Sequence, residues 1–359
     1  MFLGCHIIFG RYVNYFGVKL GKINCIRYSF FRKRLERSKV GWLSSPFLRT
    51  YSQCNALIIR ELKRPNIQIT KVAQFAGHKD SIYDFVLDAD TRTMYSACAG
   101  GFVVKWDIDN PEEGTMILQS GEAFYSIAKV ENTLKVGSRS GVIYTVDLAT
   151  NSLTDTTQLH QGGVFFIGNK YSGGEDGVLL RPKTIADGVG GHFGKNTMLL
   201  APDSLRCAIE SEDSLFVGAS DNIIYELNKS TYEVKQRLIG HTNSVFALAL
   251  IDASTLVSTG RDGMIRAWDL TIGKEVYSVP AHEYQAKSLS YNGEILLSSS
   301  MDKTIKVWNR ELELLKVIDL ERYQGHTNCI NKVEWLDDDT FVSCSDDRSI
   351  YLWKVEIMP

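Results

Sequence analysis

The sequence has no pair of cysteines in the C-x-x-C spacing typical of structural zinc sites and dithiol redox motifs. Its seven cysteines are odd in number and irregularly spaced: Cys5, Cys25, Cys54, Cys98, Cys207, Cys329 and Cys344. Such a set does not suit a disulfide framework, so we expect a reducing compartment. Several of them fall where a strand interior is expected, and free cysteine commonly serves there as a small buried apolar residue. No metal and no cofactor is predicted from them.

Long apolar runs are also absent. No segment approaches the run of about 18 apolar residues that a membrane span needs. The nearest candidate, at the N-terminus, is interrupted by Arg11. We therefore predict no membrane association.

The main part of the chain has no clustered stripe of Lys and Arg. The formal net charge is −2, but residues 1–51 carry ten Lys and Arg against the single acid Glu36, which leaves the remainder at about −11. An acidic domain without a basic stripe lacks the electrostatic footprint of a nucleic-acid-binding protein. We expect no direct nucleic-acid partner.

The sequence does contain one pattern that recurs about every 40 residues. Each of three nearly complete copies has a His, then a Ser, an Asp and a Trp: Gly240-His241, Ser258, Asp262 and Trp268-Asp269; Ala281-His282, Ser298, Asp302 and Trp308; Gly325-His326, Ser343, Asp347 and Trp353. A fourth copy contains Gly77-His78, Ser96 and Trp106-Asp107. Three weaker copies lie between, around Val136, Ser172 and Val217. The total is seven.

Each copy is predicted to form four short strands. In the copy that begins at Gly240-His241, apolar runs end at Leu248, Ser258 and Trp268 and are separated by turn residues. Arg261-Asp262-Gly263 stands between two of these runs, where Asp and Gly suit a tight hairpin turn. Helical periodicity is absent, so the pattern indicates an all-β protein.

The units that run from Gly-His to Trp-Asp, with an Asp between, resemble WD40 repeats over about residues 66–359. The resemblance implies a seven-bladed β-propeller, compact and repeat-only, similar to bacterial WD40 proteins. It also implies that His, Ser, Asp and Trp form a buried hydrogen-bonded chain within a blade, which buried polar groups require. The matching structural tetrads are His241, Ser258, Asp262 and Trp268; His282, Ser298, Asp302 and Trp308; and His326, Ser343, Asp347 and Trp353.

The other blades depart from this pattern. Their substitutions are Gly100 at the Asp position of blade 1, Ser140 at that of blade 2, Pro182 at the Trp position of blade 3, and Val217 and Leu227 at the Ser and Trp positions of blade 4. In blade 3, His160 is a shortened candidate partner for Ser172 and Asp176. We therefore expect incomplete networks in blades 1 to 4.

Ring closure is also predicted from the sequence. The last copy reaches only its third strand, which contains Trp353. The segment from Ile67 to Phe75, just before Gly77-His78, is strand-like. We expect this N-terminal strand to complete the last blade and to cover an open sheet edge.

Residues 1–60 form a basic leader that we expect to lie outside the propeller of residues 66–359. A misplaced start would explain the leader, in which case we expect a cytoplasmic protein. The alternative is a mitochondrial transit peptide, because such segments are basic and poor in acids, and Arg49-Thr50-Tyr51-Ser52 resembles a matrix-processing site. In that case we expect a location in the mitochondrial matrix.

The chain is not predicted to be an enzyme, and no catalytic residue is assigned. Ser, His and Asp recur in register with Trp in several blades, whereas a catalytic nucleophile is expected once, on an exposed turn beside its base. The stretch from Gly188 to Lys195 resembles a phosphate-binding loop, but its spacing does not fit and Asn196 stands where Ser or Thr would hold magnesium.

We compared the blades at the third and fifth positions after the His position, which are expected on the inner strands. The third residues are Ser81, Ala123, Gly163, Ser204, Ser244, Gln285 and Cys329, and the fifth are Tyr83, Tyr125, Phe165, Arg206, Phe246, Lys287 and Asn331. Neither set contains a carboxylate or an imidazole, so no metal site of ordinary nitrogen and oxygen ligation is predicted on these strands.

The fifth positions are rich in aromatic side chains, which either pack between blades or form the core of an interface. The residues before the turn Asp are expected near one rim: Ala99, Arg139, Glu175, Ser220, Arg261, Met301 and Asp346. From both sets we predict a partner-binding surface formed by Arg139, Glu175, Arg261, Met301, Asp346, Tyr83, Tyr125 and Phe246.

These observations favour a non-enzymatic scaffold for protein–protein interaction, built as a monomeric propeller with a protein or peptide partner. The alternative hypothesis is a propeller enzyme or small-molecule sensor that uses the central channel. Converging Asp, Glu or His side chains at the channel mouth would favour that alternative.

Overall fold

The computed structural model describes residues 66–181 and 196–358. The predictions for the leader of residues 1–60, for Pro182 and for the stretch from Gly188 to Lys195 lie outside these ranges. In the described ranges no helix has the length and apolar character needed to span a bilayer.

The described residues form seven four-stranded antiparallel sheets. The strands of the first three blades are β2 (Ile82–Asp88), β3 (Thr93–Cys98), β4 (Phe102–Asp107) and β5 (Asn110–Gln119); β6 (Phe124–Val130), β7 (Thr133–Ser138), β8 (Val142–Asp147) and β9 (Ser152–Gln158); and β10 (Val164–Ile167), β11 (Ser172–Gly174), β12 (Val178–Arg181) and β13 (Asn196–Leu199).

The next three blades have the same strand order. They comprise β14 (Leu205–Glu210), β15 (Ser214–Ala219), β16 (Ile223–Asn228) and β17 (Val234–Ile239); β18 (Val245–Asp252), β19 (Thr255–Gly260), β20 (Met264–Asp269) and β21 (Lys274–Pro280); and β22 (Ala286–Tyr291), β23 (Leu296–Ser300), β24 (Ile305–Trp308) and β25 (Leu314–Ile318). A single helical turn, α4 (Leu320–Tyr323), precedes blade 7 and is capped by Asp319, which accepts a hydrogen bond from the Arg322 backbone N–H.

The seventh blade joins the two ends of the ring. It contains β26 (Ile330–Trp335), β27 (Thr340–Ser345), β28 (Ile350–Met358) and, as its outermost strand, β1 (Asn66–Phe75). The pairing of β1 with β28 runs from Asn66 opposite Met358 to Phe75 opposite Ile350. This confirms the predicted seven-bladed propeller and its closure by the N-terminal strand.

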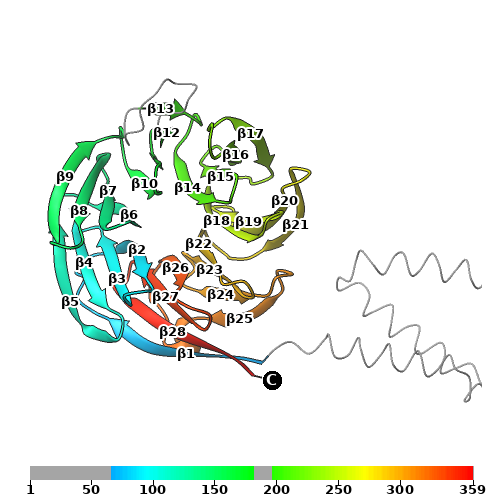
Figure 1. Cartoon of the computed structure of the whole chain (residues 1–359). Coiled ribbons are helices and arrows are strands. Elements are labelled where there is room, and N and C mark those ends of the chain that lie inside the picture. Colours follow the sequence, from blue (N-terminus) through cyan, green and yellow to red (C-terminus); the bar gives the residue numbers. More distant parts are fainter. Residues whose placement is uncertain (1–65, 182–195, 359) are drawn as a thin grey trace, which may run out of the picture. The chain divides into compact units, whose positions relative to one another are not determined.

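The sheets follow one another around a ring, with β2, β6, β10, β14, β18, β22 and β26 nearest its centre and β1 alongside β28 (Figure 1). The apolar core lies largely between neighbouring blades. In one cluster, Phe85 and Trp106 of blade 1 pack with Val342 and Leu352 of blade 7. Because each sheet is covered on both faces by its neighbours, the second strand of most blades is a continuously buried run rather than an alternating one.

Candidate functional site

The structure brings the predicted tetrad residues together in blades 5, 6 and 7. In blade 5, His241 Nδ1 lies 2.9 Å from Asp262 Oδ2, and His241 Nε2 lies 2.7 Å from Ser258 Oγ. Trp268 donates its indole N–H to the same serine oxygen at 2.7 Å. The equivalent distances are 2.8 to 2.9 Å in blades 6 and 7. Each hydrogen-bonded tetrad links the loop before the first strand of its blade to the turn between the second and third strands.

Blades 1 and 3 carry shortened versions of this chain. In blade 1, His78 lies 2.7 Å from Ser96 Oγ, which also accepts from Trp106. In blade 3, His160 lies 2.9 Å from Ser172 and 3.1 Å from Asp176, so it reaches both of its candidate partners.

Blade 2 uses a different residue for the same purpose. The Glu122 carboxylate accepts hydrogen bonds from the Ser140 N–H and hydroxyl at 2.9 Å, and from the Tyr144 hydroxyl at 3.2 Å. Sequence comparison missed Glu122 because it lies two residues beyond the His position. Blade 4 replaces the tetrad with a Tyr225 hydroxyl that donates to Asp221 at 2.6 Å.

The polar groups of the blade 5 tetrad are already engaged in hydrogen bonds with one another. Ser258 is fully buried and its oxygen is engaged by both His241 and Trp268. Burial alone would raise the pKa of Asp262, but the hydrogen bond and charge of His241 lower it to about 2. A buried serine that accepts from an indole has no access to substrate, so this Ser, His and Asp arrangement stabilises the blade.

The seven rim residues occupy equivalent positions. Each donates its backbone N–H to the carbonyl of the third-position residue of its own blade, at 2.8 or 2.9 Å. The pairs are Ala99 to Ser81, Arg139 to Ala123, Glu175 to Gly163, Ser220 to Ser204, Arg261 to Ser244, Met301 to Gln285 and Asp346 to Cys329. The rim is therefore defined by one repeated hydrogen bond beside the start of each inner strand. Arg139, Glu175, Arg261 and Met301 are exposed there.

A β-bulge interrupts every inner strand at the fifth position. The register between the first and second strands skips one residue in each blade: Tyr83, Tyr125, Phe165, Arg206, Phe246, Lys287 and Asn331. A bulged residue is left out of the ladder, and its side chain is redirected. All seven are partly exposed on the strands nearest the centre of the ring. We call these seven residues the girdle.

The girdle side chains contact one another around the ring. The rings of Tyr83 and Tyr125 have centroids 5.6 Å apart, and Tyr125 stacks on Phe165 at 5.7 Å. The Arg206 guanidinium lies 4.4 Å from the Phe165 ring centroid and 5.8 Å from that of Phe246.

Two further sets of contacts involve the girdle residues of blades 6 and 7. The Lys287 ammonium lies 5.0 Å from the Phe246 ring centroid. Asn331 donates to the Ile82 carbonyl at 2.9 Å and to Asp346 at 2.8 Å. The predicted surface residues Tyr83, Tyr125 and Phe246 thus belong to one layer of aromatic and cationic side chains. We call the girdle and the rim beside it the channel mouth.

Charge is unevenly distributed over this mouth. Blades 4 to 6 contribute Arg206, Arg261 and Lys287. Near Tyr83, burial and then Asp346 and Asp80 raise the pKa of the tyrosine, against a smaller opposing effect of Arg139. Burial and then Arg261 lower the pKa of Arg206, against a smaller opposing effect of Glu175. We call Arg206, Arg261 and Lys287 the basic arc.

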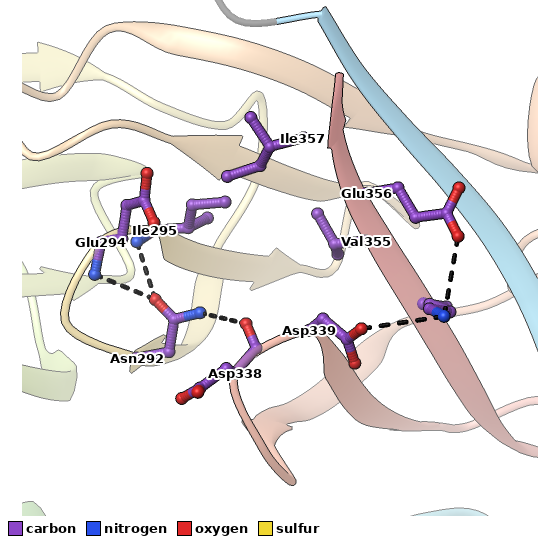
Figure 2. Close-up of a pocket in the computed structure, with 9 residues that line it drawn as sticks. Asn292, Glu294, Ile295, Asp338, Asp339, Val355, Glu356 and Ile357 are labelled. Atoms are coloured by element: carbon purple, nitrogen blue, oxygen red, sulfur yellow. Dashed lines mark hydrogen bonds and ion pairs between the residues drawn. The ribbon is translucent and has the colours of Figure 1, made fainter. Parts of the chain in front are cut away.

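A separate cavity of about 350 Å³ lies at the opposite ends of the strands of blades 6 and 7 (Figure 2). It is lined by Asn292, Glu294, Ile295, Asp338, Asp339, Lys354, Val355, Glu356 and Ile357. Asn292 accepts from the backbone N–H groups of Glu294 and Ile295 and donates to the Asp338 carbonyl, and Lys354 lies between Asp339 and Glu356. Part of its polar lining is thus paired internally, and none of the sequence-predicted site residues lines it.

Within the described ranges no group of three or more His, Cys, Asp or Glu residues is arranged to hold a metal ion. The four cysteines described there, Cys98, Cys207, Cys329 and Cys344, are free thiols. Burial raises the pKa of the Cys207 thiol to about 12 and that of Cys329 to about 11. These thiols are not activated nucleophiles.

The repeat family described as "WD domain, G-beta repeat" matches residues 69–107, 232–269, 273–309 and 318–354. The chain is 32% identical to the mouse THO complex subunit 6 homolog over 27% of each protein, and 31% identical to the small ribosomal subunit protein RACK1 of Caenorhabditis elegans over 43% of this chain and 50% of that one. The matched region spans about a quarter of the mouse protein and half of the worm protein.

The crystal structure of the WD40 β-propeller domain of Doa1 has the same fold. It superposes with a TM-score of 0.69 at 21% identity, over 80% of this chain and 97% of that domain. The four matched segments each contain one of the indole–serine hydrogen bonds, in blades 1, 5, 6 and 7. With four such repeats in a seven-bladed ring, the chain belongs to the WD40-repeat β-propellers.

Proposed function

We propose that this protein is a non-enzymatic interaction scaffold that binds a segment of a partner protein at the rim and girdle. The observation that carries the proposal is the set of seven bulges, which presents one side chain per blade at a common mouth. Aromatic and Arg side chains are enriched among interface residues that contribute most to binding. Four exposed rim residues, Arg139, Glu175, Arg261 and Met301, flank the girdle.

Two further observations support binding over catalysis. The girdle holds no carboxylate and no imidazole, the groups that usually perform proton transfer. By their names, the mouse and worm relatives are subunits of larger assemblies. The partner that we propose for this scaffold is therefore a protein. We do not propose that the scaffold binds nucleic acid or a membrane directly.

The test is affinity purification of the C-terminally tagged chain from its native cell, with mass spectrometry of the proteins that co-purify. The variant Arg139→Ala, Arg261→Ala, Met301→Ala should lose a stoichiometric partner and keep its melting temperature. The matched control replaces Lys274 and Val276, which are exposed on the outer strand β21, with alanine. Retention of every partner by the triple variant would refute binding at this face. Light scattering of the purified chain tests the expected monomer.

The same purification locates the N-terminus and the compartment. An N-terminus near residue 52 would support a cleaved transit peptide and the mitochondrial matrix. A start near residue 60 in the cytosolic fraction would support the cytoplasmic alternative.

A further inference from the structure

Three cations on adjacent blades stand at the channel mouth without an acidic partner. Among the described residues, none of Arg206, Arg261 and Lys287 forms an ion pair. Elsewhere in the propeller, partly buried cations such as Lys332 and Arg266 are paired with carboxylates. The basic arc therefore carries positive charge that no ion pair among the described residues neutralises.

The position of Arg206 is fixed by its surroundings. Its Nε donates to Ser220 Oγ at 2.7 Å, and its guanidinium lies between the rings of Phe165 and Phe246. A guanidinium held in this way loses little conformational freedom when it binds an anion, and low exposure strengthens the interaction. Lys287 also lies over Phe246, so two of the three cations share one aromatic side chain.

Exposed apolar side chains adjoin the basic arc on blade 6. Met301 is 48% exposed and Tyr284 is 61% exposed, although both are large and apolar. Met301 donates its backbone N–H to Gln285, the residue after Tyr284, so the two belong to neighbouring loops of one blade. Phe246, on the adjacent blade 5, is partly exposed. Apolar side chains clustered beside unpaired charges are typical of an interface.

The other side of the mouth carries mixed charge, because Arg139 opposes the carboxylates of Asp80 and Asp346 at Tyr83. Asp346 and Asp80 affect the titration of Tyr83, and Asp346 is oriented by the amide of Asn331. A partner whose acidic end lies over blades 4 to 6 avoids these carboxylates, whereas the reverse orientation brings like charges together. These carboxylates therefore disfavour an acidic end over blades 7 and 1.

We infer that the partner segment is an acidic peptide, with carboxylates bound by Arg206, Arg261 and Lys287 and an adjacent apolar side chain packed against Phe246, Met301 and Tyr284. The inference rests on the proposed function and adds the chemistry of its partner. The arc has three cations, and the charge of Glu175 opposes them at Arg206, so the matching segment has two carboxylates.

The experiment is a peptide-display selection from an unbiased library on the immobilised full chain. We expect the recovered peptides to carry at least two Asp or Glu next to an apolar residue. The affinity of a recovered peptide, measured by fluorescence anisotropy, should fall about 30-fold or more when its acids are replaced by Asn and Gln, or when the protein carries Arg261→Glu and Lys287→Glu. Added salt should weaken the binding.

The matched control carries the same change of charge away from the mouth, as Lys170→Glu and Lys274→Glu, and should bind as tightly as the parent. If the selection returns neutral or basic peptides whose binding is lost in the triple alanine variant, the acidic-peptide inference is overturned and the proposed function stands. If no recovered peptide depends on the rim, both are overturned. Arg206 is left intact because of its packing on Phe165, and unchanged melting temperatures establish that each variant is folded.

Discussion

The Lys332 ammonium of blade 7 lies 2.9 Å from Asp84 Oδ1 of blade 1 and donates to the Phe85 carbonyl at 2.6 Å. Burial alone would lower the pKa of Lys332, but the carboxylates of Asp84 and Glu334 raise it above its ordinary value. The amine is therefore charged throughout the physiological range. It joins two inner strands that are far apart in sequence, at the position where the ring closes.

Removal of this charge should weaken the closed ring. We expect Lys332→Met to lower the free energy of unfolding by about 2 to 3 kcal/mol, because it leaves Asp84 partly buried without its cation. Urea denaturation of Lys332→Met, Asp84→Asn and the double variant provides the measurement. The two losses should be less than additive; strict additivity would mean that the two side chains do not interact.

The β1 strand should be essential for the whole propeller. Deletion of residues 66–75 exposes the edge of β28, and we expect the domain to unfold cooperatively. A gentler test uses Ile69→Ala, which should cost about 2 to 4 kcal/mol because Ile69 is 6% exposed. Val72→Ala is the control, since Val72 on the same strand is 54% exposed. A deletion variant with an unchanged melting temperature would contradict closure by this strand.

Two adjacent serines in blade 6 separate the effect of the tetrad from that of burial. Ser298 and Ser299 are both fully buried, but Ser298 bonds to His282 and Trp308, whereas the Ser299 hydroxyl has no hydrogen-bond partner among the described residues. We expect Ser298→Ala to cost about 2 to 3 kcal/mol, because it leaves a buried indole N–H unsatisfied. Ser299→Ala should be neutral or stabilising. Equal effects in thermal melts would show that the tetrad adds nothing beyond packing.

Acid should destabilise the protein in two stages. His78 lacks an Asp partner, and burial lowers its pKa to about 4, below its unfolded value of about 6.5. The unfolded state therefore binds the proton more readily, and the stability from neutral His78 is complete above pH 6.5 and is lost as the pH falls toward 4. The loss is at most about 3 kcal/mol.

A second loss should follow at lower pH. The pKa values of Asp262 and Asp302 lie at about 2 in the fold, below the ordinary value of 3.8, so their contribution is present above pH 3.8 and disappears as the pH falls through 2.

Urea denaturation between pH 7.5 and 4.5 tests the first stage, the protonation of His78. The difference in stability between the parent and His78→Gln should shrink as the pH falls, and a constant difference would contradict the assignment.

The fold was predictable because four blades carry most of the tetrad residues and the spacing repeats. Much of the channel mouth was not. A bulge depends on the register of two paired strands, so the sequence of β2 alone does not reveal that Tyr83 is skipped. Tyr284 was missed because it is the second residue after His282, whereas the sequence prediction rested on the third and fifth. Glu122 was missed because a carboxylate from a neighbouring position performs part of the task of the absent Asp.

At each bulge, the choice of side chain is independent of the pairing between the first and second strands. A girdle residue takes no part in the pairing of its strand with the next, so replacing Phe246 or Lys287 leaves that ladder intact. A side chain at one of these sites can therefore vary without changing how the strands pair. Under the proposed function, variation at these sites changes partner choice without a new backbone, which makes them positions for engineering new binding specificities.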